Sequence, residues 1–504
     1  MSIASLSRFS ALLAAASCIS LGYATPVDTS VSAATSSLCC QSLSASLSAK
    51  LSYPSSAAYA DSLSSYWTQQ GQLITPACIL TPTSARDVSV AVSILARGSC
   101  QFAVRSGGHT SVTGASNIQD GVTIDLRSLD ATTLSSDKSL VSVGAGQRLG
   151  NLYSILHEQG LSIPGARAAG IGASGSTLGG GLGFINPSQG FAADSVVEFE
   201  IVTADGKIRR ANKKENSDLW RALKGGGNNF GVVTQIVFQT FPVKDVWGGN
   251  AAYLPATGVN GVAKAFADFT ADPNYDPNAS LLVTYYFTQG FTQIANLYVY
   301  AAPTENPAAF GVFYPLEGQL GNQTSITTVP ALSAASEAQS PHGLQQITFA
   351  VTFVNSAEIL LDLWTIFEAS IAGVQSLERI SWALTFEPVV QSIIDRTKAT
   401  GGNVLGLEVL PPQGLTLGFL SASFAKAEDY PAVSAAADKL LASVISATKK
   451  RGAYHPYIDL NHAKASQQPF KGYGSANYEF LKSTAKKYDP GRVFQTLVPG
   501  GFKL

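Results

Sequence analysis

A short glycine-rich segment with a histidine inside it constrains the fold of this chain more than any other feature. The segment is VRSGGHTSVTGAS, from Val104 to Ser116. Glycine has no Cβ, so backbone N–H groups can crowd around a bound group without steric hindrance. Such a concave arrangement of donors suits an anion, usually a phosphate. A phosphate accounts for the glycines but not for His109, and the reason for the histidine must lie elsewhere in the chain.

The N-terminus predicts export. Residues 1–24 carry one charged side chain and then an apolar run from Phe9 to Ala24, as in a secretory signal peptide cleaved near Ala24. A membrane anchor is the alternative, and it is disfavoured because the run is shorter than the roughly 20 apolar residues of a bilayer span. N-glycosylation sequons at Asn278 and Asn322 fit an exported glycoprotein. We therefore expect a secreted protein with no membrane association.

The cysteines predict two disulfides. Four remain after removal of the signal peptide with Cys18: Cys39, Cys40, Cys78 and Cys100. An even number in a secreted chain is typical of a disulfide framework. Cys39 and Cys40 are neighbours and poorly placed to bond each other, so each is expected to pair with Cys78 or Cys100, and both pairings stay open. The spacing lacks the rhythm of a metal site, so no bound metal is expected.

The hydrophobic pattern changes after about Pro242. Before it, strand-like pieces such as QFAVRS and GVTIDL alternate with glycine-dense loops. After it, alternating apolar segments such as SLLVTYYFTQ and GLTLGFLSASF are separated by helical stretches, which predicts an antiparallel sheet backed by helices. The 504 residues, 45% of them hydrophobic, suffice for two domains. A net charge of −1 makes a nucleic acid an unexpected partner.

Five motifs occur in a family-like order: VRSGGHT, GSTLGGGLG, DLWRALKGGGNNFGVVT, YIDLN and YDPGRVFQTLVPGGFKL. Together they resemble the FAD-linked oxidases of the berberine bridge enzyme-like group, in the vanillyl-alcohol oxidase superfamily, and within it a fungal secreted branch. The likeness runs from about Cys39 to Leu504. It implies a two-domain α+β fold with a signal peptide at 1–24, a lead-in at 25–70, an FAD-binding domain at 71–243, a substrate domain at 244–444 and a C-terminal segment at 445–504 that completes the FAD-binding domain.

The resemblance gives the histidine a role. It implies that His109 bonds covalently to the 8α-methyl group of FAD. The backbone of the same loop is expected to line the FAD phosphates, at Arg105, Ser106, Gly107, Gly108, Thr110 and Gly114. The second glycine run is expected to approach the flavin ring and ribityl chain, at Gly172, Gly175, Gly179 and Gly180. The third is expected to close the adenine side through Val233 and Thr234.

Three further positions follow from the resemblance. Many relatives hold the flavin a second time through a cysteine, but that position corresponds to Ala168, and no cysteine follows Cys100. The flavin is therefore predicted to be monocovalent. Ile171 falls near the family's oxygen gate, where a valine accompanies easy oxygen access and the bulkier isoleucine argues against fast oxidase activity. Asp194 occupies a position that the family keeps acidic, although it also suits a turn.

The chemistry predicts a base. When an alcohol or phenol gives up a hydride, a base should take its proton. The resemblance suggests a tyrosine of YHPYIDL that contacts substrate and cofactor, Tyr457 first and Tyr454 second. A tyrosine pKa of roughly 10 must be lowered by positive or hydrogen-bonding surroundings for this role. The alternative for both is packing in a strand.

Other side chains rank lower as catalytic candidates. Tyr285 and Tyr286 should face opposite sides of one strand, so at most one of them reaches the flavin. Glu387 is a weaker base candidate. No role is assigned to the three scattered histidines His157, His342 and His462.

The predicted function is oxidation of an alcohol, phenol or polyketide-type secondary-metabolite precursor by hydride transfer to the flavin. Oxygen or another acceptor then takes the electrons, and a monomer is expected. A carbohydrate oxidase is the alternative, but only Trp364 and Trp382 lie well inside the substrate domain, whereas a sugar groove is expected to be rich in aromatic side chains. A non-catalytic flavin-binding protein is the alternative from another class, and the intact flavin-loop motifs disfavour it. The substrate itself stays open, because fold does not determine it.

Overall fold

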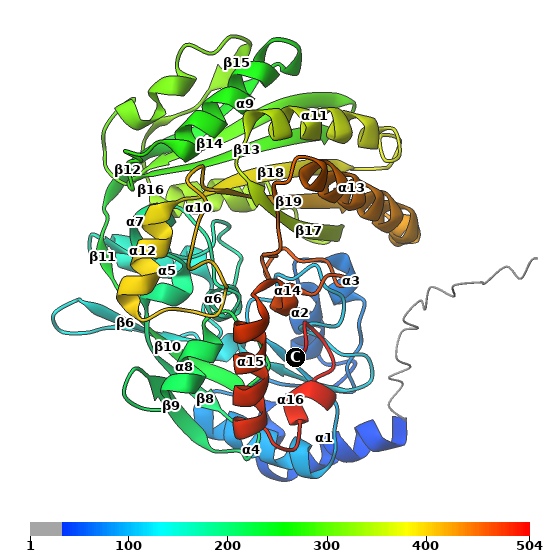
Figure 1. Cartoon of the computed structure of the whole chain (residues 1–504). Coiled ribbons are helices and arrows are strands. Elements are labelled where there is room, and N and C mark those ends of the chain that lie inside the picture. Colours follow the sequence, from blue (N-terminus) through cyan, green and yellow to red (C-terminus); the bar gives the residue numbers. More distant parts are fainter. Residues whose placement is uncertain (1–32) are drawn as a thin grey trace, which may run out of the picture. The chain divides into compact units, whose positions relative to one another are not determined.

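The structure, a computed structural model, describes residues 33–504 (Figure 1). The predicted signal peptide and its cleavage site lie outside the described residues. Within this part, small sheets and short helices precede one large sheet. No helix of residues 33–504 has both the length and the apolar character needed to cross a membrane.

Two sheets organise residues 33–242. In the first, β2 (Cys78–Leu80) and β3 (Phe102–Arg105) both run parallel to β4 (Val122–Asp125), and β1 (Leu51–Ser52) is the antiparallel edge. The second is antiparallel, in the order β5 (Thr132–Leu134), β6 (Leu140–Gly144), β10 (Val232–Gln239), β8 (Val196–Val202) and β9 (Ile208–Asn212). A separate pair joins β7 (Leu161–Ser162) to β11 (Phe241–Pro242).

The helices of this region are short. They are α1 (Ala33–Leu47), α2 (Ala57–Ser64), α3 (Gln69–Gln72), α4 (Ala85–Arg97), α5 (Leu149–His157), α6 (Ala173–Leu178), α7 (Asn186–Gln189) and α8 (Ser217–Leu223). Helix α4 begins where Ser84 caps it by accepting a hydrogen bond from Asp87 N. Its residues Val88, Val92 and Leu95 are buried at helical spacing, so one face packs into the core while the other stays polar.

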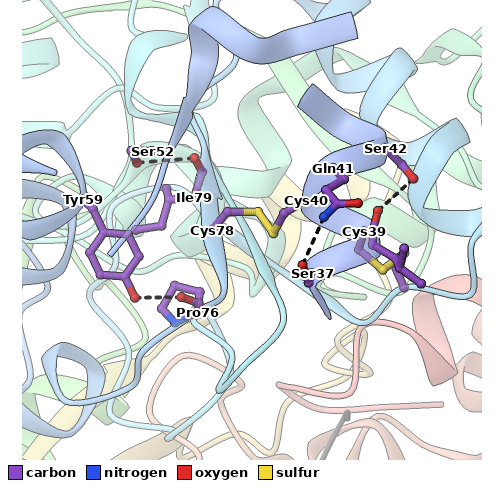
Figure 2. Close-up of a disulfide and its surroundings, with 12 residues drawn as sticks. Ser37, Cys39, Cys40, Gln41, Ser42, Ser52, Tyr59, Pro76, Cys78 and Ile79 are labelled. Atoms are coloured by element: carbon purple, nitrogen blue, oxygen red, sulfur yellow. Dashed lines mark hydrogen bonds between the residues drawn. A yellow bond between two sulfur atoms is a disulfide. The ribbon is translucent and has the colours of Figure 1, made fainter. Parts of the chain in front are cut away.

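The disulfides attach α1 to the first sheet. Cys40 pairs with Cys78 on β2 and Cys39 pairs with Cys100, with Cα–Cα distances of 6.1 and 6.0 Å (Figure 2). The prediction of two disulfides is confirmed. Because the two cysteines are neighbours on one helix, they reach two different segments, one at β2 and one just before β3.

A nine-stranded antiparallel sheet dominates residues 245–455. Its order is β15 (Gln319–Asn322), β12 (Asp245–Tyr253), β14 (Phe291–Tyr300), β13 (Ala279–Thr288), β18 (Ser381–Val389), β19 (Leu415–Phe424), β17 (Gln345–Val354) and β20 (Tyr454–His455), with β16 (Ser325–Thr328) also paired to β12. Strands β13 and β14 form a hairpin whose turn residues Gln289 and Gly290 both have positive φ, as a tight two-residue hairpin turn requires.

The two faces of this sheet differ because side chains alternate along each strand. On one face, Leu281, Val283 and Tyr285 pack under helices α9 (Pro255–Ala271), α11 (Ala357–Ile371) and α13 (Tyr430–Lys450) (Figure 1). The opposite face carries Thr284 and Tyr286, and it borders helix α10 (Val329–Ala338) and the glycine loops of the first region. The predicted antiparallel sheet backed by helices is confirmed.

The segment after the large sheet returns to the first region. Its helices are α14 (Pro469–Gly472), α15 (Ser475–Tyr488) and α16 (Val493–Thr496). Phe102 N of β3 donates to Leu497 O, and the Phe102 ring meets that of Phe494 edge-on. Helix α12 (Gln391–Thr400) is tied to the first region as well, since Thr397 Oγ1 donates to Asp194. Segments from the whole length of the described chain therefore enclose the space under the large sheet.

Candidate active site

A cavity of about 1250 Å³ lies between the glycine loops and the open face of the large sheet. Pockets for small molecules usually measure roughly 300–1,000 Å³. The cavity therefore has room for a large ligand together with a smaller one.

Two glycine loops touch at the cavity wall. A Cβ on Gly107 would overlap the backbone of Gly172, and a Cβ on Gly172 would overlap Gly107 N. Next to this contact, Ser174 Oγ lies 3.0 Å from Ser106 Oγ, and both hydroxyls donate to Ala145 O. The close approach explains why these positions are glycines, and it leaves a wall made largely of backbone.

His109 lies on the same wall in an apolar setting. Its ring stacks on Trp67 with a centroid distance of 4.1 Å and an angle of 9°. Its Nε2 is buried and has no hydrogen-bond partner within residues 33–504. Burial lowers the pKa of His109 to about 4, with smaller contributions from Glu337, which raises it, and from His342 and Arg148, which lower it. The imidazole is therefore neutral at ordinary pH and keeps a free nitrogen lone pair.

The opposite wall is the open face of the large sheet. Its polar side chains are mainly neutral: Thr284, Tyr286, Thr288, Gln293, Gln346, Thr348, Ser381, Thr385, Ser421 and Ser423. Ser111 Oγ and Thr348 Oγ1 lie 2.6 Å apart and connect this wall to the histidine loop. Among the described lining residues, full charges come from Arg167, Arg379 and Asp459, and Arg167 is paired with Glu387.

Comparisons with known proteins agree with this architecture. A family model described as an FAD binding domain matches residues 76–212. The FAD-dependent monooxygenase sdcF of Emericella nidulans is 35% identical over 489 residues, which cover 94% of this chain and 99% of that protein. The chain belongs to this family of FAD-dependent oxidoreductases.

Two further known proteins, one compared by sequence and one by structure, are similar to this oxidoreductase. The bifunctional solanapyrone synthase of Alternaria solani is 32% identical over 85% of this chain and 82% of its own. Among solved structures, the glucooligosaccharide oxidase of Acremonium strictum, described with a 6-S-cysteinyl, 8α-N1-histidyl FAD, has a TM-score of 0.74 at 18% identity and covers 90% of this chain and 97% of its own. At that identity the likeness is one of fold. The expected vanillyl-alcohol oxidase-type α+β fold is confirmed.

Two observations indicate that FAD fits the cavity. The wall at Gly107 and Gly172 leaves no room for a Cβ and presents backbone, and the buried Nε2 of His109 lacks a partner. Most of the predicted cofactor residues line the cavity: Ser106, Gly107, Gly108, His109, Thr110, Gly172, Gly175 and Val233. Ala168 and Ile171 line it too.

Five other predicted cofactor residues of this oxidoreductase lie off the cavity wall, and two of them, Arg105 and Gly179, have structural roles. Arg105, Gly114, Gly179, Gly180 and Thr234 are absent from the cavity wall. The Arg105 guanidinium is buried, donates to Ser62 O and Ser65 Oγ, and lies 3.8 Å from the Tyr66 ring centroid. It therefore holds the segment before the loop. Gly179 instead leaves room for the side chain of Asn461, whose Nδ2 donates to Ser176 O.

The two tyrosines expected to act as base do not reach the cavity. Tyr457 is fully buried, stacks on Tyr473 and donates to Asp459 Oδ1 across 3.4 Å. Burial raises the pKa of Tyr457 well above its usual range, and the negative charge of Asp459 raises it further. The lowered pKa that the base role would require is therefore not found, since within residues 33–504 the groups that act on this hydroxyl are Asp459, Tyr473 and Glu387, none of them a cation. Tyr454 pairs with Phe353 at the edge of the sheet and also lies off the wall.

An acid–histidine pair that the sequence did not predict does line the cavity. His462 Nδ1 lies 2.7 Å from Asp459 Oδ2, and the His462 ring stacks on Phe419 with centroids 4.0 Å apart. A carboxylate beside Nδ1 favours the tautomer with the proton on Nδ1 and leaves the lone pair on Nε2. The sequence does contain a signal for this pair. Asp459 belongs to the motif YIDLN, and His462 follows that motif directly, three residues after the aspartate. Nothing in the sequence placed Phe419 beside it.

Three other candidates have clear positions. Tyr285 is buried and donates to Leu360 O, whereas Tyr286 lines the cavity, so the predicted opposite orientation is confirmed. Glu387 receives two hydrogen bonds from Arg167 and is held as a buried ion pair. Asp194 is buried, its pKa is raised by burial, and it accepts from Phe191 N, Thr397 and Asn403.

Proposed function

We propose that this oxidoreductase carries FAD attached through His109 alone and oxidises a neutral hydroxyl-bearing molecule of the alcohol, phenol or polyketide type. The observation that carries the proposal is one cavity with two functional walls. One wall carries the contact between Gly107 and Gly172 and His109, whose buried Nε2 has no hydrogen-bond partner within residues 33–504. The other wall carries the Asp459–His462 pair and a row of neutral hydroxyl groups.

The covalent bond to His109 is supported by its surroundings. A neutral, buried imidazole whose Nε2 has no hydrogen-bond partner within residues 33–504 keeps the lone pair that a bond to the flavin 8α carbon requires. The glucooligosaccharide oxidase described above has both a cysteinyl and a histidyl bond to its FAD. In residues 33–504 of this chain every cysteine is in a disulfide, so a second bond has no thiol to use.

The residues of the chain handle substrate and proton. Bound FAD supplies the hydride acceptor. His462 accepts the proton of the substrate hydroxyl at Nε2, while Asp459 holds the ring and stabilises the imidazolium that forms. Phe419 fixes the plane of the ring. The sheet hydroxyls, among them Thr284 and Ser421, orient the substrate through neutral hydrogen bonds.

The neutral wall also supports the substrate class. On the open sheet face, Phe419 is already stacked on His462, so Tyr286 is the free aromatic side chain there. Trp67 is stacked on His109, and the other aromatic lining residues, Phe470, Phe494 and Phe502, belong to the C-terminal segment. A carbohydrate oxidase would need more aromatic surface on the sheet face. The relatives named as FAD-dependent monooxygenases and as solanapyrone synthase favour a secondary-metabolite substrate.

Stopped-flow reduction of the flavin tests the proposal. A panel of alcohols, phenols and sugars is mixed with the purified protein, and bleaching of the flavin band identifies a substrate. His462→Gln should then slow reduction by about 10²-fold to 10⁴-fold, the usual range for a general base, with unchanged flavin content. Reduction of His462→Gln at the parent rate would refute the base assignment, and reduction by sugars alone would refute the substrate class.

Secretion is part of the proposal. Two disulfides are typical of proteins in oxidising compartments, and both sequon asparagines, Asn278 and Asn322, are exposed. Protein recovered from the culture medium should begin near Thr25 and lose mass on enzymatic deglycosylation. Retention of residues 1–24 on cell-associated protein would contradict it.

A further inference from the structure

A second histidine and a carboxylate lie beside His109, contributed by the last turn of helix α10 and the segment that follows it. The His342 ring meets His109 edge-on, with centroids 6.2 Å apart and an angle of 86°. His342 Nε2 lies 2.5 Å from Glu337 Oε1, and Glu337 Oε2 accepts a 2.7 Å hydrogen bond from Gly170 N. Trp67 covers the other side of His109 and donates from Nε1 to Ser340 O.

The position of Glu337 is not explained by the helix that carries it. Glu337 is in the last turn of α10, where the helix dipole disfavours a negative charge. Burial also raises the pKa of Glu337, but hydrogen bonds from His342 and Gly170 N and the nearby His109 outweigh burial and lower it. A Cβ on Gly170 would overlap Glu337 Oε1, so glycine at this position admits the carboxylate. The carboxylate is thus held ionised next to two imidazoles.

Covalent attachment of the flavin requires a proton acceptor at this place. One C–H bond of the 8α-methyl group breaks, one N–H bond of His109 breaks, and a C–N bond forms. The two electrons remain on the flavin, which is thereby reduced, and dioxygen takes them up later with two protons to give hydrogen peroxide. The proton leaving the His109 ring needs a nearby base, because Trp67 and the loop enclose the ring.

We propose that His342, held by Glu337, accepts the proton that His109 loses when it bonds to the flavin. The proposal rests on the covalent bond proposed above. The charged and titratable groups around His109 are Glu337, His342 and Arg148, whose Nη2 donates to Gly107 O. Of these, the His342–Glu337 pair can accept a proton, whereas Arg148 adds positive charge that opposes protonation of His109.

The test measures how much flavin stays on the chain after denaturation. Full-length protein is compared with His342→Gln and Glu337→Gln, and His157→Gln serves as the matched control because it removes an imidazole on α5 away from the cavity. In-gel flavin fluorescence and intact mass give the covalent share at purification and during incubation with added FAD. Filtration of undenatured protein gives the total bound FAD.

We expect the parent and His157→Gln to be fully flavinylated. His342→Gln and Glu337→Gln should bind FAD but attach it about 10-fold to 100-fold more slowly, at the lower end of acid–base effects. Added imidazole should speed attachment in His342→Ala, which a merely structural role would not permit.

Two outcomes overturn different claims. If the parent releases all its flavin on denaturation, the covalent bond fails and the pair has no such role. If the parent holds its flavin and both glutamine variants attach theirs at the parent rate, the covalent bond stands and the proton-acceptor role is wrong. Slow attachment in His342→Ala that added imidazole does not rescue would also refute the role and leave only packing.

Discussion

Ile171 lies between two glycines that each admit another part of the chain. Gly170 makes room for Glu337, and Gly172 touches Gly107. Both neighbours are fixed, so the Ile171 side chain has little freedom where it lines the cavity. A branched side chain held in this way limits access along the wall by its size.

Ile171→Val should therefore speed reoxidation of the reduced flavin by oxygen and leave the reductive half-reaction unchanged. The variant removes one methylene at a position where the wall cannot close up around the gap. Stopped-flow traces of the two half-reactions separate the effects. Leu182→Val is the control, because it removes one methylene elsewhere on the same cavity wall. Equal reoxidation rates for Ile171→Val and the parent would show that oxygen arrives by another route.

Tyr457→Phe should reduce its flavin within about 3-fold of the parent rate, far from the 10²-fold to 10⁴-fold loss expected for a base. The hydroxyl is buried against Asp459 and off the cavity wall, so its loss removes one long hydrogen bond. The measurement is flavin reduction by the substrate that the panel identifies. A loss of 100-fold or more at unchanged flavin content would restore Tyr457 as a base.

At the scale of elements, the contact between the two glycine loops holds the cofactor wall together. Gly107 follows β3 and Gly172 precedes α6, so their contact fixes one loop against the other. Apart from the Ser106 hydroxyl, which donates to Ala145 O, the contact is backbone against backbone. An added methyl group must push the backbones apart.

Gly172→Ala should lower both the stability and the bound FAD, since overpacking of a tight contact typically costs 1–3 kcal/mol. Gly311→Ala is the control, because a Cβ there meets no atom within 4 Å and Gly311 does not line the cavity. It should retain both stability and bound FAD. Denaturant unfolding and flavin absorbance give the two readouts. A Gly172→Ala protein as stable and as yellow as Gly311→Ala would contradict the role of the contact.

The disulfides should stabilise the first sheet without affecting the cofactor site. Their sequence separations of 61 and 38 residues correspond to about 4 kcal/mol each on the chain-entropy model, an upper value. Cys40→Ser with Cys78→Ser should therefore lower the free energy of unfolding by about 2–4 kcal/mol at unchanged covalent flavin. Thiol counting on the denatured, unreduced parent should find no free thiol among these four cysteines. Four free thiols would refute both bonds.

Local pattern predicted many of the elements. GVTIDL forms β4, RLGNLYSILHEQG contains α5, and SLLVTYYFTQ forms β13, because the apolar spacing of each segment fits one kind of element. The disulfide pairing and the order of the large sheet were not predictable, since both depend on segments far apart in the chain.

The residues of the candidate site were likewise predicted only in part. The motifs that resemble the family predicted His109, Gly107 and Gly172 as cofactor residues, and these three line the cavity, but the contact between the two glycines was not predicted. The positions of Gly114, Gly179 and Tyr457 off the cavity wall were not predicted, because they depend on how the backbone turns at these residues. His462 and His342 gained their roles from Phe419 and Glu337, which other elements supply.

At the scale of the whole molecule, FAD should stabilise the protein by joining walls from distant segments. His109→Ala leaves the backbone wall intact, so the variant should bind FAD reversibly. Free FAD at 100 times its Kd should then add about 2.7 kcal/mol of stability and raise the thermal midpoint. If the flavin is bonded to His109 as proposed, the parent should not respond to added FAD. A midpoint of His109→Ala that ignores saturating FAD would show that the cofactor does not fill this cavity.

The cavity wall includes Phe494, Val498 and Phe502 together with Trp67, which lies more than 400 positions earlier. During synthesis the early glycine loops emerge from the ribosome before these C-terminal wall residues have been made. A cofactor pocket therefore does not exist on the growing chain. The complete wall can enclose FAD only after translation has passed residue 502, so closure of the pocket around the cofactor follows synthesis of all its walls.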